Sequence, residues 1–133
     1  MDDRTLIELA HQARAHAYAP YSHFTVGAAL LTEDGQVFSG CNAENASYGA
    51  SNCAERTAFF KAVSEGHTKF SKIAIVGGEK DAANCPTCYP CGICRQVMYE
   101  FCDPARFTVI LEGSDGNILR FTLGELLPRA FEK

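Results

Sequence analysis

The chain has 133 residues, of which 47% are hydrophobic, so one domain with a buried core is expected over residues 1–133. Its formal net charge of −4 is unlike the basic excess of most nucleic-acid-binding surfaces, and no apolar run approaches the length that spans a bilayer. The acidic, polar N-terminus does not resemble a secretory signal. We therefore expect neither a nucleic-acid nor a membrane partner.

The period of the apolar residues, with the Gly and Pro residues that interrupt it, predicts alternating helices and strands. Pro20 ends the first helix, Gly66 ends the second, and Pro90 suits the first position of the third. The pair Asp34-Gly35 lies between two apolar runs and is a strong hairpin signal. In chain order we expect a helix over 4–17, strands over 24–31 and 36–41, a loop over 42–52, a helix over 53–65, a strand over 72–77, a loop over 78–89, a helix over 90–101, strands over 107–111 and 118–121, and a short helix over 122–127.

This order predicts an α/β fold in which one central sheet has helices on its faces. The run Lys-Ile-Ala-Ile-Val-Gly at 72–77 is typical of a strand that is buried on both faces.

The chain has seven cysteines, which in a secreted domain would indicate a disulfide scaffold. Their number is odd and no secretory signal is present. Four of them crowd together at metal-type spacing in the run C-P-T-C-Y-P-C-G-I-C, namely Cys85, Cys88, Cys91 and Cys94. This pattern favours a reducing cytoplasm and a metal site, whereas Cys41 and Cys102 are typical of small buried hydrophobic residues.

Two predicted helix starts bring three of these thiols together. Ser51 or Asn52 is a good N-cap, so Cys53 is expected in the first turn of a helix, where a thiolate is favoured. Cys91 and Cys94 are three residues apart in the first turn of the next helix and share one face. Three thiolates around zinc would leave the fourth position to water, which is the pattern of catalytic sites.

Glu55 lies two residues beyond Cys53 and has two interpretations. The first is a helix cap, because S/N-x-x-E is a common helix start. The second is proton transfer, because a carboxyl group beside a catalytic zinc can carry protons to a substrate. Zinc with three thiolates has a net charge of −1, which weakens the ion as a Lewis acid. A neighbouring cation is therefore needed to offset this charge. Arg56 and Arg95 could donate to the sulfurs, or could simply be solvated on a helix surface.

The spacing C-A-E with P-C-x-x-C matches that of the zinc deaminases. Nearly the whole chain resembles the cytidine deaminase family, in its small homotetrameric form with a three-cysteine zinc site. The segments that carry the resemblance are A-Y-A-P-Y-S-H-F-T-V-G-A-A-L (17–30), G-C-N-A-E-N-A-S-Y-G (40–49), N-C-A-E-R-T-A (52–58), P-C-G-I-C-R-Q-V (90–97) and E-L-L-P-R-A-F (125–131).

The resemblance implies a three-layer α-β-α fold with a five-stranded mixed sheet, assembled as a homotetramer whose active sites are shared between subunits. It implies zinc-dependent hydrolytic deamination of cytidine and 2′-deoxycytidine in pyrimidine salvage, with one zinc ion per chain. The implied zinc ligands are Cys53, Cys91 and Cys94, with Glu55 as the proton shuttle and Arg56 balancing the charge of the site.

The resemblance also implies a set of substrate-binding residues. Asn42 and Glu44 would bind the ribose 3′-hydroxyl, and Phe24 would pack on the base. The backbone N–H of Ala54 would contact the pyrimidine O2, because a helix N-terminus presents free N–H groups. Neighbouring subunits would contribute Tyr48 and Phe131.

Cys85 and Cys88 have no role in the family pattern, and could be free thiols, a disulfide formed on oxidation or an adventitious metal site. One alternative function is a related deaminase of the blasticidin S type. Another, from a different class, is a non-catalytic module in which Cys85, Cys88, Cys91 and Cys94 bind zinc or an iron–sulfur cluster. A polynucleotide editor is disfavoured by the acidic charge and the short chain.

Overall fold

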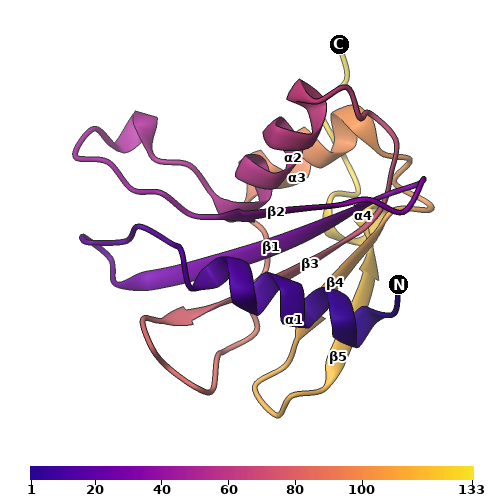
Figure 1. The fold of residues 1–133 in the computed structure, drawn as a ribbon. Helices are drawn as coiled ribbons and strands as arrows, with labels where there is room; N and C mark the ends of the chain where they lie inside the picture. Colours follow the sequence, from indigo (N-terminus) through magenta and orange to yellow (C-terminus); the bar gives the residue numbers. More distant parts are fainter.

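A five-stranded mixed sheet forms the centre of the computed structural model, which describes residues 1–133 (Figure 1). The strand order is β2-β1-β3-β4-β5. Only β3 and β4 pair in parallel, and the other neighbours are antiparallel. The strands are β1 (Phe24–Thr32), β2 (Val37–Cys41), β3 (Phe70–Glu79), β4 (Thr108–Glu112) and β5 (Ile118–Thr122).

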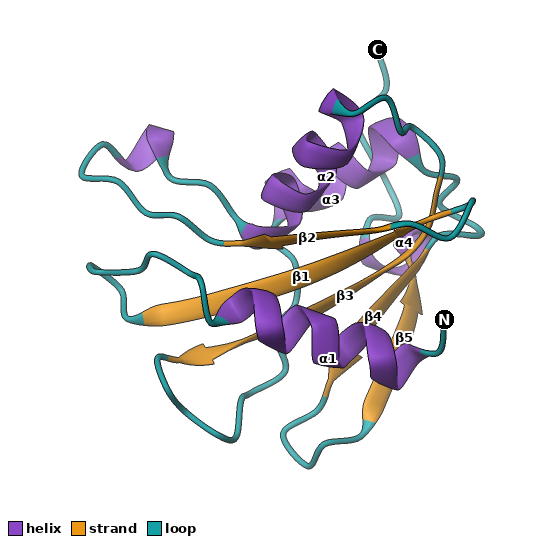
Figure 2. Ribbon diagram, viewed as in Figure 1, coloured by secondary structure: helices purple, strands orange, loops and turns teal.

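Helices cover both faces of this sheet and complete the three layers (Figure 2). Helix α1 (Asp3–Arg14) lies on one face, and α2 (Ala54–Ser64) and α3 (Gly92–Phe101) lie on the other, with the short α4 (Leu123–Leu126). A single 3-10 turn, η1 (Tyr48–Ala50), interrupts the loop between β2 and α2. The expected α/β architecture with a five-stranded mixed sheet is therefore confirmed. None of the helices is long and apolar enough to cross a membrane.

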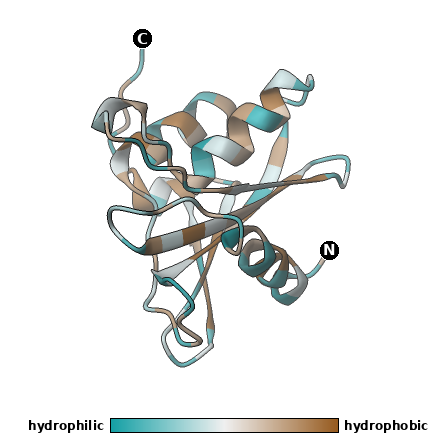
Figure 3. Ribbon diagram, turned by 60° about the vertical axis from the view of Figure 1, so that its left-hand side comes forward, coloured by the Kyte–Doolittle hydropathy of each residue, from teal (hydrophilic) through white to brown (hydrophobic).

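The alternation of side chains along β1 divides the core into two halves. Ala28 and Leu30 pack against α2 and α3, in a cluster that contains Phe59 and Phe107. Ala29 and Leu31 point the other way and pack under α1. Figure 3 shows hydrophobic stretches along the central strands, between α1 and the pair of α2 and α3.

Two glycines let helices approach the sheet closely. A Cβ built on Gly27 would lie 1.9 Å from the backbone oxygen of Ala10 in α1. A Cβ built on Gly40 would lie 2.4 Å from the backbone oxygen of Ala54, the first residue of α2. Because Gly40 has no side chain, the N-terminus of α2 rests directly on β2, and this contact fixes the end of the helix that carries Cys53.

The first helix is shorter than the expected span of 4–17. It ends at Arg14, and a turn at Ala15 and His16 follows, closed by bonds from the N–H groups of His16 and Ala17. Beyond them the backbone of Tyr18 pairs with the loop after β2: its N–H donates to Asn42, and its carbonyl accepts from Glu44. This tertiary pairing overrides the local helical pattern.

The starts of the other two main helices also differ from expectation. Cys53 is itself the N-cap of α2 and Cys91 is the N-cap of α3, so neither lies in a first helical turn. Pro90 precedes the cap of α3 and does not occupy the first helical position. Neither cysteine makes a side-chain capping bond, which leaves both sulfurs available to a metal ion.

Candidate metal centre and active site

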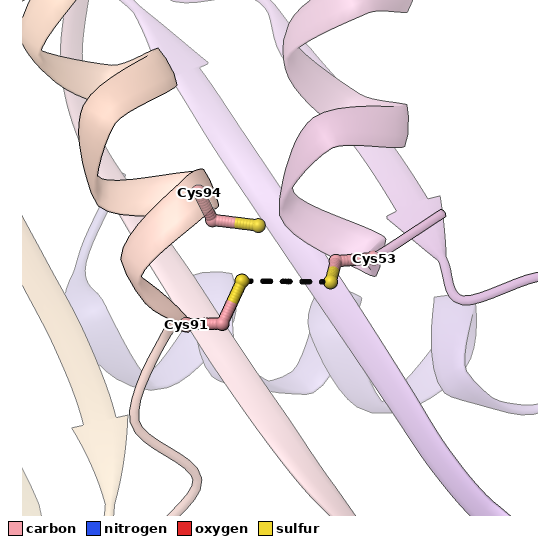
Figure 4. Close-up of side chains that lie close together, drawn as sticks. All are labelled: Cys53, Cys91 and Cys94. Atoms are coloured by element: carbon pink, nitrogen blue, oxygen red, sulfur yellow. Dashed lines mark hydrogen bonds between the residues drawn. The ribbon is translucent and has the colours of Figure 1, made fainter. Parts of the chain in front are cut away.

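The N-terminal ends of α2 and α3 bring three sulfurs to one place (Figure 4). Cys53 and Cys91 cap the two helices, and Cys94 lies in the first turn of α3. Their Sγ atoms all lie within 4.8 Å of one another. Cys94 is buried, Cys53 is half-buried and Cys91 is exposed, so the cluster opens to solvent on one side.

The spacing of these sulfurs suits a tetrahedral zinc ion. Zinc–sulfur bonds of about 2.3 Å at tetrahedral angles put neighbouring sulfurs about 3.8 Å apart. The Sγ atoms of Cys53 and Cys91, which the dashed line in Figure 4 joins, are 3.8 Å apart. Three sulfur ligands would leave one coordination position of a zinc ion free, and the exposed side of the cluster faces solvent.

Neighbouring donors favour the thiolate form of Cys53. The neighbouring thiol of Cys94, and then Arg56, whose Nη2 donates to the Cys53 sulfur at 3.1 Å, lower the pKa of Cys53 to about 5. A thiolate is the form of cysteine that binds zinc. The positive charge of Arg56 also offsets part of the negative charge that three thiolates bring to the centre.

Arg95, the other cation considered for the sulfurs, lies elsewhere. Its Nε donates to the carbonyl of Pro90 at 2.8 Å, and its Nη1 donates to the carbonyl of Leu126 at 2.7 Å. Arg95 therefore ties the start of α3 to the end of α4, and of its two possible roles the contact with a thiolate is not made.

Glu55 is a buried carboxyl group beside the sulfur cluster. It is 4% exposed, and burial, together with the charge of Cys53, raises the pKa of Glu55 to about 7. The capping interpretation is wrong: with Cys53 as the N-cap, Glu55 is the second helical residue, whereas a capping box uses the third. A carboxyl group with this pKa can both accept and release a proton near neutral pH.

An open hollow of about 330 Å³ lies beside the cluster and Glu55. It is lined by most of the residues that the sequence assigns to the site, namely Asn42, Glu44, Tyr48, Cys53, Ala54, Glu55, Arg56 and Cys91. Ala54 is the first residue of α2, and the first N–H groups of a helix have no acceptor within it. Such an N–H can donate to a ligand in the hollow.

Asn42 and Glu44 reach the hollow from the loop after β2, and both also hold the chain around Phe24. The Asn42 side chain accepts from the N–H of Val26 at 2.8 Å and donates to the carbonyl of Phe24 at 2.9 Å. Glu44 accepts from the N–H groups of Tyr21 at 3.0 Å and Ser22 at 3.1 Å. An amide and a carboxylate each keep further hydrogen-bonding capacity for a ligand.

Phe24 and Phe131 do not line this hollow. Phe24 begins β1, and its ring packs over Gly77 beside the opening, because a Cβ built on that glycine would lie 3.1 Å from Phe24 Cε2. Phe131 is 74% exposed, and Tyr48, at the rim, is 87% exposed. Both rings are therefore available to a second chain.

The C-terminal segment that carries Phe131 is fastened to α3. The side chain of Gln96 forms two hydrogen bonds with the backbone of Phe131. Gln96 Nε2 donates to the Phe131 carbonyl at 2.9 Å, and Gln96 Oε1 accepts from the Phe131 N–H at 3.2 Å. The hydroxyl of Tyr99 donates to Glu132. These contacts hold the backbone of the segment and leave the Phe131 ring free.

Cys85 and Cys88 do not join the metal cluster. A Cβ built on Gly77 would lie 2.8 Å from the Cys88 sulfur, and one built on Gly78 would lie 2.8 Å from the Cys85 sulfur. Consecutive strand residues face opposite sides of a sheet, so the two thiols lie on opposite faces of β3. The four-cysteine module is therefore excluded, and so is a Cys85–Cys88 disulfide without a rearrangement of the loop.

Cys88 and Tyr89 line the hollow, and the sequence reasoning did not assign them to the site. The one signal in the sequence is the pair Gly77-Gly78 at the end of β3, which makes room for both sulfurs. Burial is the main cause, and nearby negative charges a smaller one, that raises the pKa of Cys88 to about 12. This thiol therefore keeps its proton at neutral pH.

Comparison with known proteins adds independent findings. A family model for the cytidine and deoxycytidylate deaminase zinc-binding region matches residues 1–110. A cytidine deaminase of Halalkalibacterium halodurans is 54% identical over 131 residues, which cover 98% of this chain and 95% of that protein. The crystal structure of a cytidine deaminase from Burkholderia pseudomallei is similar with a TM-score of 0.88 at 50% identity, covering 98% of this chain and 100% of that one.

The blasticidin S alternative is more distant. A blasticidin-S deaminase of Bacillus cereus is 28% identical over 134 residues, covering 98% of this chain and 93% of that protein.

Proposed function

The chain belongs to the cytidine and deoxycytidylate deaminase family. We propose that it hydrolyses the bond between C4 and the amino nitrogen of cytidine and 2′-deoxycytidine. Water is consumed, ammonia leaves, and the products are uridine and 2′-deoxyuridine. The observation that carries the proposal is the buried carboxyl group of Glu55 beside three converging thiols at the mouth of an open hollow. The physiological role that we propose is pyrimidine salvage.

We assign the zinc ion of this family to Cys53, Cys91 and Cys94. The distance between the sulfurs and the lowered pKa of Cys53 support this assignment. When bound, zinc supplies a Lewis acid that lowers the pKa of a water molecule at its open position. Arg56 donates to the Cys53 sulfur and reduces the net negative charge of the centre.

Glu55 is the proton carrier in this proposal. Deamination requires a proton at N3 of the base while water adds to C4, and a second proton on the departing amino group. A carboxyl group with a pKa of about 7 can take a proton from water and release it to N3, and then carry another to the amino nitrogen. Its burial excludes bulk water from these transfers.

The substrate is bound by groups around the hollow. The N–H of Ala54 at the start of α2 donates to O2 of the pyrimidine, and Phe24 packs against the base from the edge of the hollow. Asn42 and Glu44 bind the 3′-hydroxyl of the sugar, because both retain hydrogen-bonding capacity after their contacts with the chain around Phe24.

The active enzyme in this proposal is a homotetramer. Each active site receives Tyr48 and Phe131 from neighbouring subunits. Support comes from the exposure of both rings and from the fastening of the C-terminal segment by Gln96. A cytoplasmic location is also proposed, since none of the seven cysteines is paired in a disulfide, as suits a reducing compartment.

Turnover of cytidine, 2′-deoxycytidine and blasticidin S, measured side by side as ammonia release, tests the proposed function. We expect both nucleosides to be deaminated at least about 100-fold faster than blasticidin S, because one differential hydrogen-bonding contact to a substrate already gives factors of this order. Faster release from blasticidin S would contradict the proposal and support the alternative deaminase.

A further inference from the structure

The chain between Ala19 and Phe24 makes a strained turn before it enters β1. His23 has a φ of +59°, in the left-handed region that a non-glycine residue occupies only when its surroundings hold it there. Two backbone bonds hold this turn: the N–H of His23 donates to the carbonyl of Ala19 at 3.0 Å, and the N–H of Lys80 donates to the carbonyl of His23 at 2.8 Å. The turn brings Ser22 alongside Phe24.

The side chain of Glu44 makes all of its hydrogen bonds in this structure with that turn. Its Oε1 accepts from the N–H groups of Tyr21 and Ser22, and its Oε2 accepts from the hydroxyl of Ser22. These bonds, first among them that of the Ser22 hydroxyl, hold the pKa of Glu44 below its usual range. Glu44 is therefore an ionised group that can only accept hydrogen bonds.

The direction of the Ser22 hydroxyl hydrogen is fixed, because one of its two partners can only donate a hydrogen bond and the other can only accept one. The N–H of Phe24 donates to Ser22 Oγ at 3.0 Å, and this group can only donate. The hydroxyl hydrogen is thus directed to the Glu44 carboxylate, which can only accept. One hydroxyl links the carboxylate of Glu44 to the backbone of Phe24.

We propose that Ser22 is a positioning residue for sugar recognition, which orients the Glu44 carboxylate toward the substrate's 3′-hydroxyl. The inference rests on the proposed function, in which Glu44 binds that hydroxyl. Ser22 does not itself line the hollow, whereas Glu44 does, so Ser22 acts through Glu44. Without the Ser22 hydroxyl, Oε2 loses its only protein donor and the carboxylate can rotate away from the sugar.

The test compares Ser22→Ala, Ser22→Cys and Ser22→Thr on cytidine and on 3′-deoxycytidine, which lacks the hydroxyl in question. Alanine removes the donor, cysteine keeps the size of the side chain with a weak donor, and threonine keeps the hydroxyl. Ser22 is exposed, so the added methyl of threonine has room. Zinc content and melting temperature are measured for every variant.

For cytidine, we expect Ser22→Ala and Ser22→Cys to lower kcat/KM about tenfold, mainly through KM, because a hydrogen bond to a charged group is lost. For 3′-deoxycytidine, kcat/KM should change by less than about twofold, because the contact that Ser22 supports is absent from that substrate. Ser22→Thr should restore cytidine turnover to within about threefold.

Glu44→Ala separates failure of this inference from failure of the proposed function. If Glu44→Ala leaves the preference for cytidine over 3′-deoxycytidine unchanged, the proposed sugar contact is wrong and the role of Ser22 falls with it. If Glu44→Ala abolishes the preference but Ser22→Ala and Ser22→Cys do not reduce it, only the inference is overturned. In a Glu44→Ala background, Ser22→Ala should have no further effect on cytidine turnover. An additive loss in this double variant would show that Ser22 has a merely structural role. So would an equal loss on cytidine and 3′-deoxycytidine in the Ser22→Ala single variant.

Discussion

At the scale of single residues, Glu55 combines two properties that a surface carboxyl group does not have. It is 4% exposed, and burial raises its pKa to about 7. It also lies at the second position of α2, where it does not cap the helix. Stability and chemistry can therefore be separated at this residue by a substitution that keeps its shape.

Glu55→Gln should retain the fold and the zinc ion but lose at least about 10²-fold in kcat, because an amide cannot carry a proton between water and the base. Cytidine turnover, zinc content and melting temperature are measured together. The control is Glu8→Gln, the same change at an exposed position of α1, which should leave turnover unchanged. Near-normal activity of a zinc-loaded Glu55→Gln protein would contradict the proton-carrier role.

The cysteines offer a second test at this scale, because three of them form the cluster and two others, Cys85 and Cys88, lie outside it. Cys53→Ala, Cys91→Ala and Cys94→Ala should each reduce zinc from about one ion per chain to well below it, since each removes a ligand. Cys85→Ala and Cys88→Ala should keep the ion, because these thiols pack against Gly78 and Gly77 outside the cluster. Loss of zinc from either of the last two, with retention in Cys53→Ala, would overturn the ligand assignment.

At the scale of elements, the position of the metal centre depends on how α2 rests on β2. A Cβ at Gly40 would lie 2.4 Å from the backbone oxygen of Ala54 and 2.6 Å from the backbone nitrogen of Ala58. Backbone atoms cannot swing aside as a flexible side chain can. The start of α2, and Cys53 with it, would have to move away from the sheet.

Gly40→Ala should therefore lower the free energy of unfolding by about 1–3 kcal/mol or more, and should weaken zinc binding although Gly40 touches no ligand sulfur. Chemical denaturation and zinc titration provide the two measurements. Gly92→Ala is the matched control, because nothing lies within 4 Å of its added Cβ; a first helical residue changed from Gly to Ala should leave stability equal or raise it by up to about 1 kcal/mol. Equal effects of the two substitutions would refute the close-packing explanation.

The elements themselves were largely predictable from sequence, because the apolar period and the turn residues are local signals. The helix starts were displaced by a residue or more, because Ser51 and Asn52 are statistically better caps than the Cys53 that occupies the position. The separation of Cys85 and Cys88 onto opposite faces of β3 could not be read from their spacing, since it depends on where the loop before α3 meets Gly77 and Gly78.

The same limit applies within the site. The three proposed zinc ligands and the proposed proton carrier Glu55 follow from local spacing at two helix starts. The bonds from Ser22 and Tyr21 to Glu44 join residues more than 20 positions apart, so only the tertiary structure reveals them. Arg95 shows the opposite case: its adjacency to Cys94 suggested a sulfur contact, but its guanidinium group instead joins the carbonyls of Pro90 and Leu126.

At the scale of the whole molecule, the C-terminal segment ends on the outside of α3 with an aromatic ring exposed to solvent. Terminal segments usually fray unless contacts hold them, yet the Gln96 side chain bonds both the N–H and the carbonyl of Phe131. A fastened backbone with a free ring is the arrangement expected if Phe131 is presented to a neighbouring subunit. The proposed function gives it the substrate in that subunit as its partner.

Phe131→Ala should then raise KM for cytidine about three- to tenfold, with zinc content unchanged, because one aromatic contact with the base is lost. Mixing Phe131→Ala subunits with inactive Glu55→Gln subunits under reversible dissociation should restore sites with the wild-type KM, since an intact Glu55 from one chain then meets an intact Phe131 from the other. Mixing Phe131→Ala subunits with a Glu55→Gln, Phe131→Ala double variant provides no intact ring and should restore none. If mixed oligomers demonstrably form without any wild-type sites, or if a monomer by sedimentation is fully active, each chain builds its own site and the shared-site proposal is wrong.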